Sequence, residues 1–301
     1  MAKILVVGSI NMDLVVRVPH APNPGETVLG GDFETYPGGK GANQAVAASR
    51  MGGEVTMVGR VGNDDFGDTL IQGLVENKIK TTYVIKDSEA PSGVAMIAVA
   101  SNGENIIVVA SGANHKVSVE DVNNTRALMR DADVLLLQLE SPLDTVTAAV
   151  ELAKAYDVPV ILNPAPAQEL SKQLLAQIDY LTPNQHELEM MTGEKDIESS
   201  IKKIKEWGVK NLIITLGHNG TRVITAGMDK HFPAFEVTAV DTTAAGDAFN
   251  GALAVALAEG KSLVDAVRLA MAAGALSVTK RGAQPSLPER ESVDSFLANQ
   301  K

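Results

Sequence analysis

Short apolar runs alternate with segments of helical length along most of the chain. Several runs are apolar at consecutive positions, which is typical of strands in a parallel sheet that helices cover on both faces. The intervening segments, such as residues 42–50 and 248–257, carry the small or amphipathic residues of helices. The predicted strands are residues 4–7, 55–58, 134–137, 158–162, 180–181 and 212–215. The pattern therefore predicts an α/β fold with a mostly parallel central sheet covered by helices on both faces.

Two other stretches break this pattern and look like antiparallel strands. Residues 94–100 and 105–110 flank Asn102-Gly103, a favoured hairpin turn because both positions tolerate positive φ. Residues 14–18 and 27–36 flank a segment rich in proline. Together they predict a small antiparallel β-sheet of about four strands beside the main domain. This sheet is either a lid or interface, or a pair of hairpins with no further role.

This small sheet divides the chain into two parts. Residues 1–10, 38–90 and 112–301 are the predicted main domain, and residues 11–37 and 91–111 the predicted lid. Alternation at Val94, Met96, Ala98 and Ala100 gives the lid an apolar face that four strands cannot bury alone. One side of the lid can close over a ligand, while the opposite edge can pair with a second copy. We therefore expect a homodimer clasped through the lid.

Composition narrows the class of protein. With 301 residues, of which 45% are hydrophobic, the chain can bury one full core. A net charge of −11 disfavours nucleic acid and membrane surfaces as partners. Cysteine is absent, which excludes disulfides, thiol catalysis and thiolate metal sites. Because the start lacks the pattern of a signal peptide and no apolar run is long enough to span a membrane, we expect a cytoplasmic protein.

The segment 241–247 carries the strongest candidate chemistry. It follows a strand-like run at 235–240 and opens a predicted helix. Its small residues Ala244, Ala245 and Gly246 let backbone amides at a helix N-terminus approach an anion closely. Asp247 can act as a general base toward a hydroxyl held beside that anion. The alternative is that Asp241 and Asp247 only cap the helix.

A second glycine-rich turn, residues 38–44, also leads into a predicted helix. Lys40 and Asn43 bring a cation and an amide to a place where the backbone is bare, which suits a polyhydroxyl ligand or a phosphate. The segment does not match the phosphate loop of nucleoside triphosphatases. The alternative is a helix start with a solvated lysine.

Polar residues also follow the first predicted strand. Asn11 and Asp13 are two positions apart, so in extended chain they point to one side, where a carboxylate and an amide can bind neighbouring hydroxyls of a sugar. Carboxyl ends of strands line the ligand crevice in open α/β sheets. Gly8 does not begin a Gly-x-Gly-x-x-Gly fingerprint, which disfavours a dinucleotide oxidoreductase.

These motifs together resemble the PfkB-type carbohydrate kinases. The resemblance runs from about residue 4 to 296, and it rests on the segments 8–13, 38–44, 59–67, 163–166 and 241–247. Segments 138–142 and 282–286 are similar to those of ribokinases within that family. The resemblance implies ATP-dependent phosphorylation of a sugar, D-ribose to D-ribose 5-phosphate first among the candidates, on a ribokinase-like fold.

The resemblance also assigns roles to matching residues. Asp247 is the implied base, and the amides of Ala244, Ala245 and Gly246 stabilise the transferring phosphoryl group. The implied sugar contacts are Asn11, Asp13, Gly39, Lys40, Asn43, Glu140 and Asp247.

Other matching positions imply a nucleotide site and two metal ions. The implied nucleotide contacts are Asn184, Thr215, Gly217, Gly220, Gly246 and Met271, with Glu187 near Mg²⁺ and phosphate. Met271 stands where ribokinases often have a histidine beside the adenine, and it can equally be a helix core residue. Potassium is the implied activator, held by Asp241, Ser286 and the carbonyls of Thr243, Ser277, Lys280 and Gly282.

Two alternatives stay open. Kinases for fructose, deoxyribose or a nucleoside share the scaffold, and ribose is favoured through the resemblance alone. A sugar-sensing binding protein without turnover is the alternative from another class. The intact Asp247 and Gly246 argue against it, because such a protein does not need the base.

Overall fold

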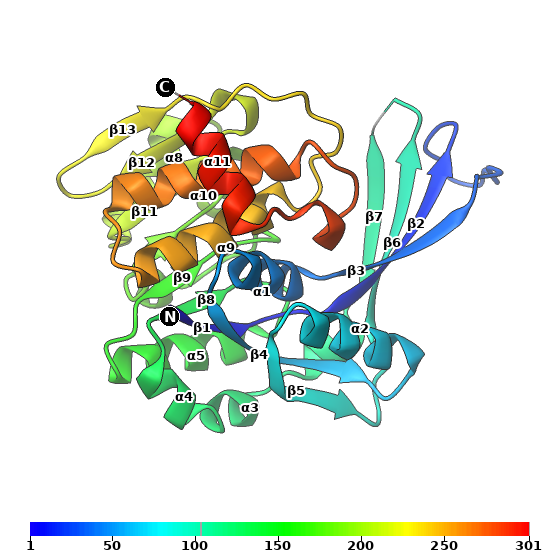
Figure 1. Ribbon diagram of the computed structural model, residues 1–301, viewed down its shortest axis with the longest axis horizontal. Coiled ribbons are helices and arrows are strands. Elements are labelled where there is room, and N and C mark those ends of the chain that lie inside the picture. Colours follow the sequence, from blue (N-terminus) through cyan, green and yellow to red (C-terminus); the bar gives the residue numbers. More distant parts are fainter. Residues whose placement is uncertain (103, 301) are drawn as a thin grey trace.

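The computed structural model describes residues 1–102 and 104–300, and a nine-stranded sheet forms its centre (Figure 1). The strand order is β13-β12-β11-β10-β9-β8-β1-β4-β5. The bounds are β1 (Lys3–Val7), β4 (Glu54–Gly62), β5 (Lys80–Asp87), β8 (Val134–Leu137), β9 (Val160–Leu162), β10 (Tyr180–Leu181), β11 (Asn211–Thr215), β12 (Thr221–Ile224) and β13 (Asp229–Phe232). All neighbours from β5 to β11 pair in parallel, while β12 and β13 are antiparallel.

Helices cover both faces of this sheet, which explains the consecutive apolar residues of its strands. Ile4 and Val6 of β1 point into one apolar cluster, and Leu5 and Val7 into the other. The first cluster is covered by α1 (Lys40–Arg50), α2 (Asp65–Glu76), α9 (Ala245–Ala258), α10 (Leu263–Ser277) and α11 (Arg290–Asn299). The second is covered by α3 (Val119–Asn123), α4 (Arg126–Asp131), α5 (Leu143–Ala155), α6 (Lys172–Leu175), α7 (Gln185–Thr192) and α8 (Ile197–Glu206). The predicted α/β class is confirmed.

A second sheet stands beside the main domain (Figure 1). Its order is β3-β2-β6-β7, with β2 (Asn11–Val18), β3 (Phe33–Gly38), β6 (Gly93–Ala100) and β7 (Asn105–Ala110). The two outer pairs are antiparallel, but the central pair β2–β6 is parallel. The reason is that both β2 and β6 leave the main domain in the same direction. The sheet is therefore mixed rather than wholly antiparallel.

Several predicted strands differ from the observed ones. Residues 27–32 are not a strand, and β3 begins at Phe33. Gly30 and Gly31 lie in that segment, and glycine weakens strands. The strand predicted at 235–240 is wrong as well. This segment is irregular and packs against a helix. Phe235 packs edge-on against Phe296 of α11, with 5.3 Å between ring centroids.

Three strands at the sheet edges, β5, β12 and β13, were not predicted, since their polar positions hide the apolar pattern. The predicted hairpin turn at Asn102-Gly103 includes Gly103, which lies outside the described residues. Within the part of the chain that the structure describes, no helix has the length and apolar character to cross a bilayer.

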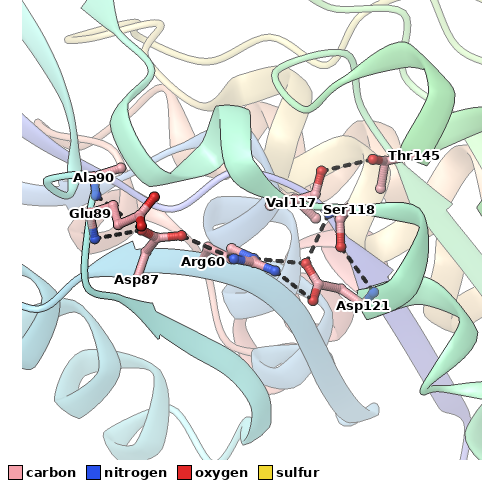
Figure 2. Close-up of polar contacts among 8 residues, drawn as sticks. All are labelled: Arg60, Asp87, Glu89, Ala90, Val117, Ser118, Asp121 and Thr145. Carbon is pink, nitrogen blue, oxygen red and sulfur yellow. Dashed lines mark hydrogen bonds and ion pairs between the residues drawn. The ribbon is translucent and has the colours of Figure 1, made fainter.

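Arg60 of β4 anchors the loop that leads into β6 (Figure 2). Its guanidinium bonds Asp87 at 3.0 Å and Asp121 of α3 at 2.8 and 2.9 Å. Asp87 in turn accepts hydrogen bonds from the backbone of Glu89 and Ala90. Asp121 also forms a capping box with Ser118 at the start of α3. The entrance to the small sheet is thereby fixed to the main domain.

Candidate active site

The turn before α9 leaves backbone N–H groups directed outward from the helix. Ala244 is the N-cap and has a left-handed conformation, with φ of 60°. Among the described residues no side chain caps this end. The first turn of a helix has N–H groups without intrahelical partners, and they carry the positive end of its dipole. The N–H of Ala245 makes a long hydrogen bond to the carbonyl of Thr242, at 3.3 Å. The turn formed by Ala244, Ala245 and Gly246 is compatible with anion binding, and that role stays a prediction.

Asp247 lies in this first turn and is 6% exposed. Its Oδ2 accepts a hydrogen bond from Asn43 at 3.0 Å, and its Oδ1 accepts one from Gln44 at 3.0 Å. Burial raises the pKa of Asp247, while Lys40 and the two amide donors oppose that shift. The carboxylate is thus held in one orientation by α1, and it is not the helix cap.

Close packing between helices brings α1 and α9 together at this point. Gly251 of α9 faces Ala47 of α1, and a Cβ added at Gly251 would lie 2.5 Å from that of Ala47. Gly39, the N-cap of α1, has φ of 86°, and a Cβ there would lie 2.7 Å from the backbone N of Asn11. Both positions require glycine because a side chain would push the site apart.

The predicted sugar-binding residues surround Asp247. Asn11 and Asp13 extend from one face of β2, and Glu140 follows β8. Burial raises the pKa of Asp13 to about 7, with further contributions from Glu140 and Asp247 and opposition from Lys40. Burial lowers the pKa of Lys40, but the carboxylates of Asp247 and Glu140 outweigh it and the net shift is upward. The lysine therefore remains charged among carboxylates.

Ser9 is not among the predicted site residues, yet it fixes one of these carboxylates. Its hydroxyl donates to Oε2 of Glu140 at 2.5 Å, and the backbone N of Lys40 donates to the same oxygen at 3.2 Å. Among the described residues, no hydrogen bond is made to the other oxygen of Glu140.

Three further buried polar residues at the site were also not predicted. Gln138 and Asn163 bond to Gln44, and Asn114 bonds to Asn11. Each is far in sequence from the residue that it contacts. Gln138 and Asn163 belong to the motif segments 138–142 and 163–166, but the contacts that they make join distant parts of the chain, and Asn114 lies in none of the motifs.

Five of the predicted nucleotide-binding residues lie at or after the carboxyl ends of β10 and β11. Asn184 and Glu187 form a capping box at the start of α7, and Asn184 makes a β-bridge with Thr215. Burial raises the pKa of Glu187, while the Asn184 backbone N–H and Lys40 oppose it. Gly217 and Gly220, which follow β11, have positive φ of 58° and 95°. Glu187 is close enough to Lys40 and Asp247 for their charges to shift its pKa.

Met271 does not join that group by any described contact. It lies on α10, is 9% exposed and packs in the first apolar cluster. Its contact with an adenine stays a prediction.

Asp241 joins two of the segments that carry the predicted cation-binding residues. Asp241 accepts hydrogen bonds from the backbone N and the hydroxyl of Thr243, at 2.9 and 2.6 Å. Its other oxygen accepts from the backbone N of Gly282 at 2.9 Å. Ser277 and Ser286 are fully buried nearby in sequence, and Lys280 N donates to Ser277 O. Oxygen donors of this kind fit a hard cation.

The chain matches the pfkB family carbohydrate kinases over residues 1–290, and it belongs to that family. A ribokinase of Haemophilus influenzae is 45% identical over 297 residues, which cover 97% of this chain and 97% of that protein. The ribokinase of Thermotoga maritima has a similar solved structure, with a TM-score of 0.91 and 44% identity over 99% of this chain and 100% of that one. Arabidopsis thaliana ribokinase, solved with ribose and ATP, gives a TM-score of 0.89 at 35% identity and covers 99% of each chain. The family and fold predicted from the motifs are confirmed.

Proposed function

We propose that this protein transfers the γ-phosphoryl group of ATP to the 5-hydroxyl of D-ribose. The observation that carries the proposal is the Asp247 carboxylate, held by Asn43 and Gln44 at a helix N-terminus that no described side chain caps. A general base and an anion-binding turn within one helical turn suit phosphoryl transfer to an alcohol. The similarity to ribokinases supports ribose as the sugar.

In this proposal each cluster has one task. Asp247 takes the proton from the sugar hydroxyl, and the amides of Ala244, Ala245 and Gly246 stabilise the charge on the transferring group. The sugar hydroxyls are bound by Asn11, Asp13, Gly39, Lys40, Asn43 and Glu140.

The nucleotide binds beside this cluster. Asn184, Thr215, Gly217, Gly220 and Gly246 contact ATP, with Met271 near the adenine and Glu187 near the phosphates. Magnesium bound to ATP supplies charge neutralisation of the phosphates. Lys40 contributes a fixed positive charge on the sugar side, since carboxylates keep it protonated.

Potassium is proposed as an activator. Asp241 and Ser286, with the carbonyls of Thr243, Ser277, Lys280 and Gly282, would hold it. Asp241 already links the turn before α9 to the segment around Gly282. A cation there orders the backbone from which the anion-binding amides project.

The small sheet, residues 11–37 and 91–111, is proposed as a lid and dimer clasp. Its root packs on the main domain, where Met12 is buried in the first apolar cluster and Leu14 packs against it. Farther out the sheet exposes Phe33, Met96 and Val108 at 64%, 49% and 53%. Apolar surface of this kind is typical of an interface, and a second copy would cover it.

The proposed setting is the cytoplasm, with small molecules rather than nucleic acid or membrane as partners. The net charge of −11 supports this, because it repels polyanions.

A coupled assay of ADP release tests the function. D-ribose, 2-deoxyribose, fructose and a nucleoside are compared at equal concentration, and the product is identified by mass and by the position of its phosphate. We expect the highest kcat/KM with D-ribose. A higher value with another sugar would replace ribose, and sugar binding without ADP release would support the sugar-sensing alternative.

A further inference from the structure

Gln44 makes three hydrogen bonds in the interior next to the proposed base. It is fully buried on α1. Its Nε2 donates to Oδ1 of Asp247 and to Oδ1 of Asn163, both at 3.0 Å. Its Oε1 accepts from Gln138 at 2.6 Å. This set of partners fixes which end of the amide faces the carboxylate, because a reversed amide would place oxygen against oxygen.

We propose that Gln44 is a positioning residue for Asp247, which holds Oδ1 of the carboxylate and keeps it ionised and directed toward the sugar hydroxyl. The proposal rests on the proposed function, in which Asp247 is the base. Asn43 holds the other oxygen, but Asn43 is also a proposed sugar contact. All three hydrogen bonds of Gln44 are to buried protein side chains. Its hydrogen bond to Asp247 therefore stays in place when the sugar binds or leaves.

The charges around Asp247 show why such a donor matters. Lys40 on α1 favours the ionised carboxylate, whereas Glu140 after β8, Asp13 on β2 and Glu187 on α7 disfavour it. Burial acts in the same direction as these three carboxylates. A hydrogen bond donated to the charged form opposes both effects. Loss of the Gln44 donor should therefore leave Asp247 protonated at higher pH.

Substitution Gln44→Met removes the donor at nearly constant volume. We expect the acid limb of the kcat–pH profile to move up by about one pH unit, with about a tenfold loss of kcat at a pH on that limb and much less on the plateau above it. Gln138→Met is the matched control. It replaces a second fully buried glutamine in the same chain of hydrogen bonds. Gln44 keeps its bonds to Asp247 and Asn163 in this variant, so the acid limb should move much less than in Gln44→Met.

A direct titration separates positioning from activity. Aspartate carboxyl carbons are labelled with ¹³C, and Asp247→Asn identifies the Asp247 signal. In Gln44→Met this signal should titrate at higher pH than in the wild type. Gln44→Glu keeps the size of the side chain and places a second carboxyl at the same oxygen, so it should shift the titration in the same direction if Gln44→Met does not fold.

Three outcomes decide the matter. An unchanged acid limb and an unchanged Asp247 titration in the Gln44 variants would overturn the proposal, and so would an equal shift in Gln138→Met. A wild type that phosphorylates no sugar, but whose Asp247 titration still depends on Gln44, would refute the proposed function and leave the positioning role standing.

Discussion

Asn114 donates a hydrogen bond from Nδ2 to Oδ1 of Asn11 at 2.6 Å. The same amide also bonds to the backbone N and O of Ile10, at 2.8 and 3.1 Å. Asn114 follows β7 and is 1% exposed, whereas Asn11 begins β2. One side chain therefore joins the first strand entering the small sheet to the last one leaving it. In the part of the chain that the structure describes, the Nδ2 of Asn11 has no acceptor, which is compatible with its proposed contact to the sugar.

Substitution Asn114→Leu should weaken sugar binding. It leaves Asn11 Oδ1 without its donor, so the Asn11 amide is free to rotate away from the orientation that suits a hydroxyl. We expect KM for the sugar to rise about tenfold, as about 1–2 kcal/mol predicts, with kcat changed less than about threefold. Steady-state kinetics measure both. The exposed neighbour His115→Ala is the control, and an equal rise there would contradict the role of Asn114.

Substitution Asp247→Asn should lower kcat by about 10²- to 10⁴-fold, the range for loss of a general base. Folding should survive, because Asn43 can reverse its amide and accept from the new Nδ2. The Oδ1 of Asn43 has no hydrogen-bond partner among the described residues, so reversing this amide breaks no bond to that oxygen. Sugar binding is measured by calorimetry and turnover with saturating ribose. Retention of more than about half the wild-type rate would remove Asp247 from the role of base.

Sugar affinity should depend on pH through Asp13. The pKa of Asp13 is raised to about 7, so this carboxylate gains its proton as the pH falls below neutrality and then accepts hydrogen bonds from hydroxyls less well. We expect KM for the sugar to increase about tenfold from pH 8 to pH 6. In Asp13→Asn the affinity should be lower at pH 8 and nearly independent of pH. A pH dependence that persists in Asp13→Asn would assign it to another group.

Potassium should raise the rate over sodium at equal ionic strength, since the proposed cation site adjoins the anion-binding turn. The ADP-release assay measures this in buffers that differ in the cation alone. Asp241→Asn should reduce the difference, because it weakens the hydrogen bonds of Asp241 to Thr243 and Gly282. Equal rates of the wild type in the two salts would refute the proposed activation.

Substitution of Met96 and Ala98 together by aspartate should dissociate the proposed dimer and raise KM for the sugar. Charges on this face of the lid oppose its burial against a second copy. Sedimentation equilibrium gives the mass, and Met190→Asp changes another exposed methionine, on α7, as the control. A monomeric wild type at micromolar concentration would exclude the dimer. A monomeric variant with unchanged KM would show that assembly and the lid are independent.

Local pattern was enough to predict much of the fold. The buried strand β8 has the predicted bounds because its four residues are apolar and helices cover both sides. The edge strand β13 and its neighbour β12 contain charged residues such as Asp229 and Arg222, so periodicity does not separate them from loops. The central pair β2–β6 shows a different limit, because strand direction depends on where the chain leaves the main domain.

The residues of the candidate site also divide into those that local sequence pattern predicts and those that it does not. Asp247 and Asn43 belong to compact motifs whose residue types already indicate their chemistry. Asn114 belongs to none of these motifs, and it becomes part of the site through its contact with Asn11, far from it in sequence. Gln138 does belong to a motif, but its hydrogen bond to Gln44 likewise joins distant segments. Such contacts carry no local signal in one sequence, and only the tertiary structure identifies them.

The parallel pairing of β2 with β6 has a consequence for how the protein folds. Asn11 pairs with Gly93, and the chain between them forms β4, α2 and β5 of the main domain. The entropy of closing that long loop opposes the pairing until the intervening elements are in place. The small sheet should therefore form late in folding, once Arg60 has joined Asp87 to Asp121. In the native protein its amide hydrogens should exchange with solvent before those of β1 and β8, because its opening breaks few contacts of the main core.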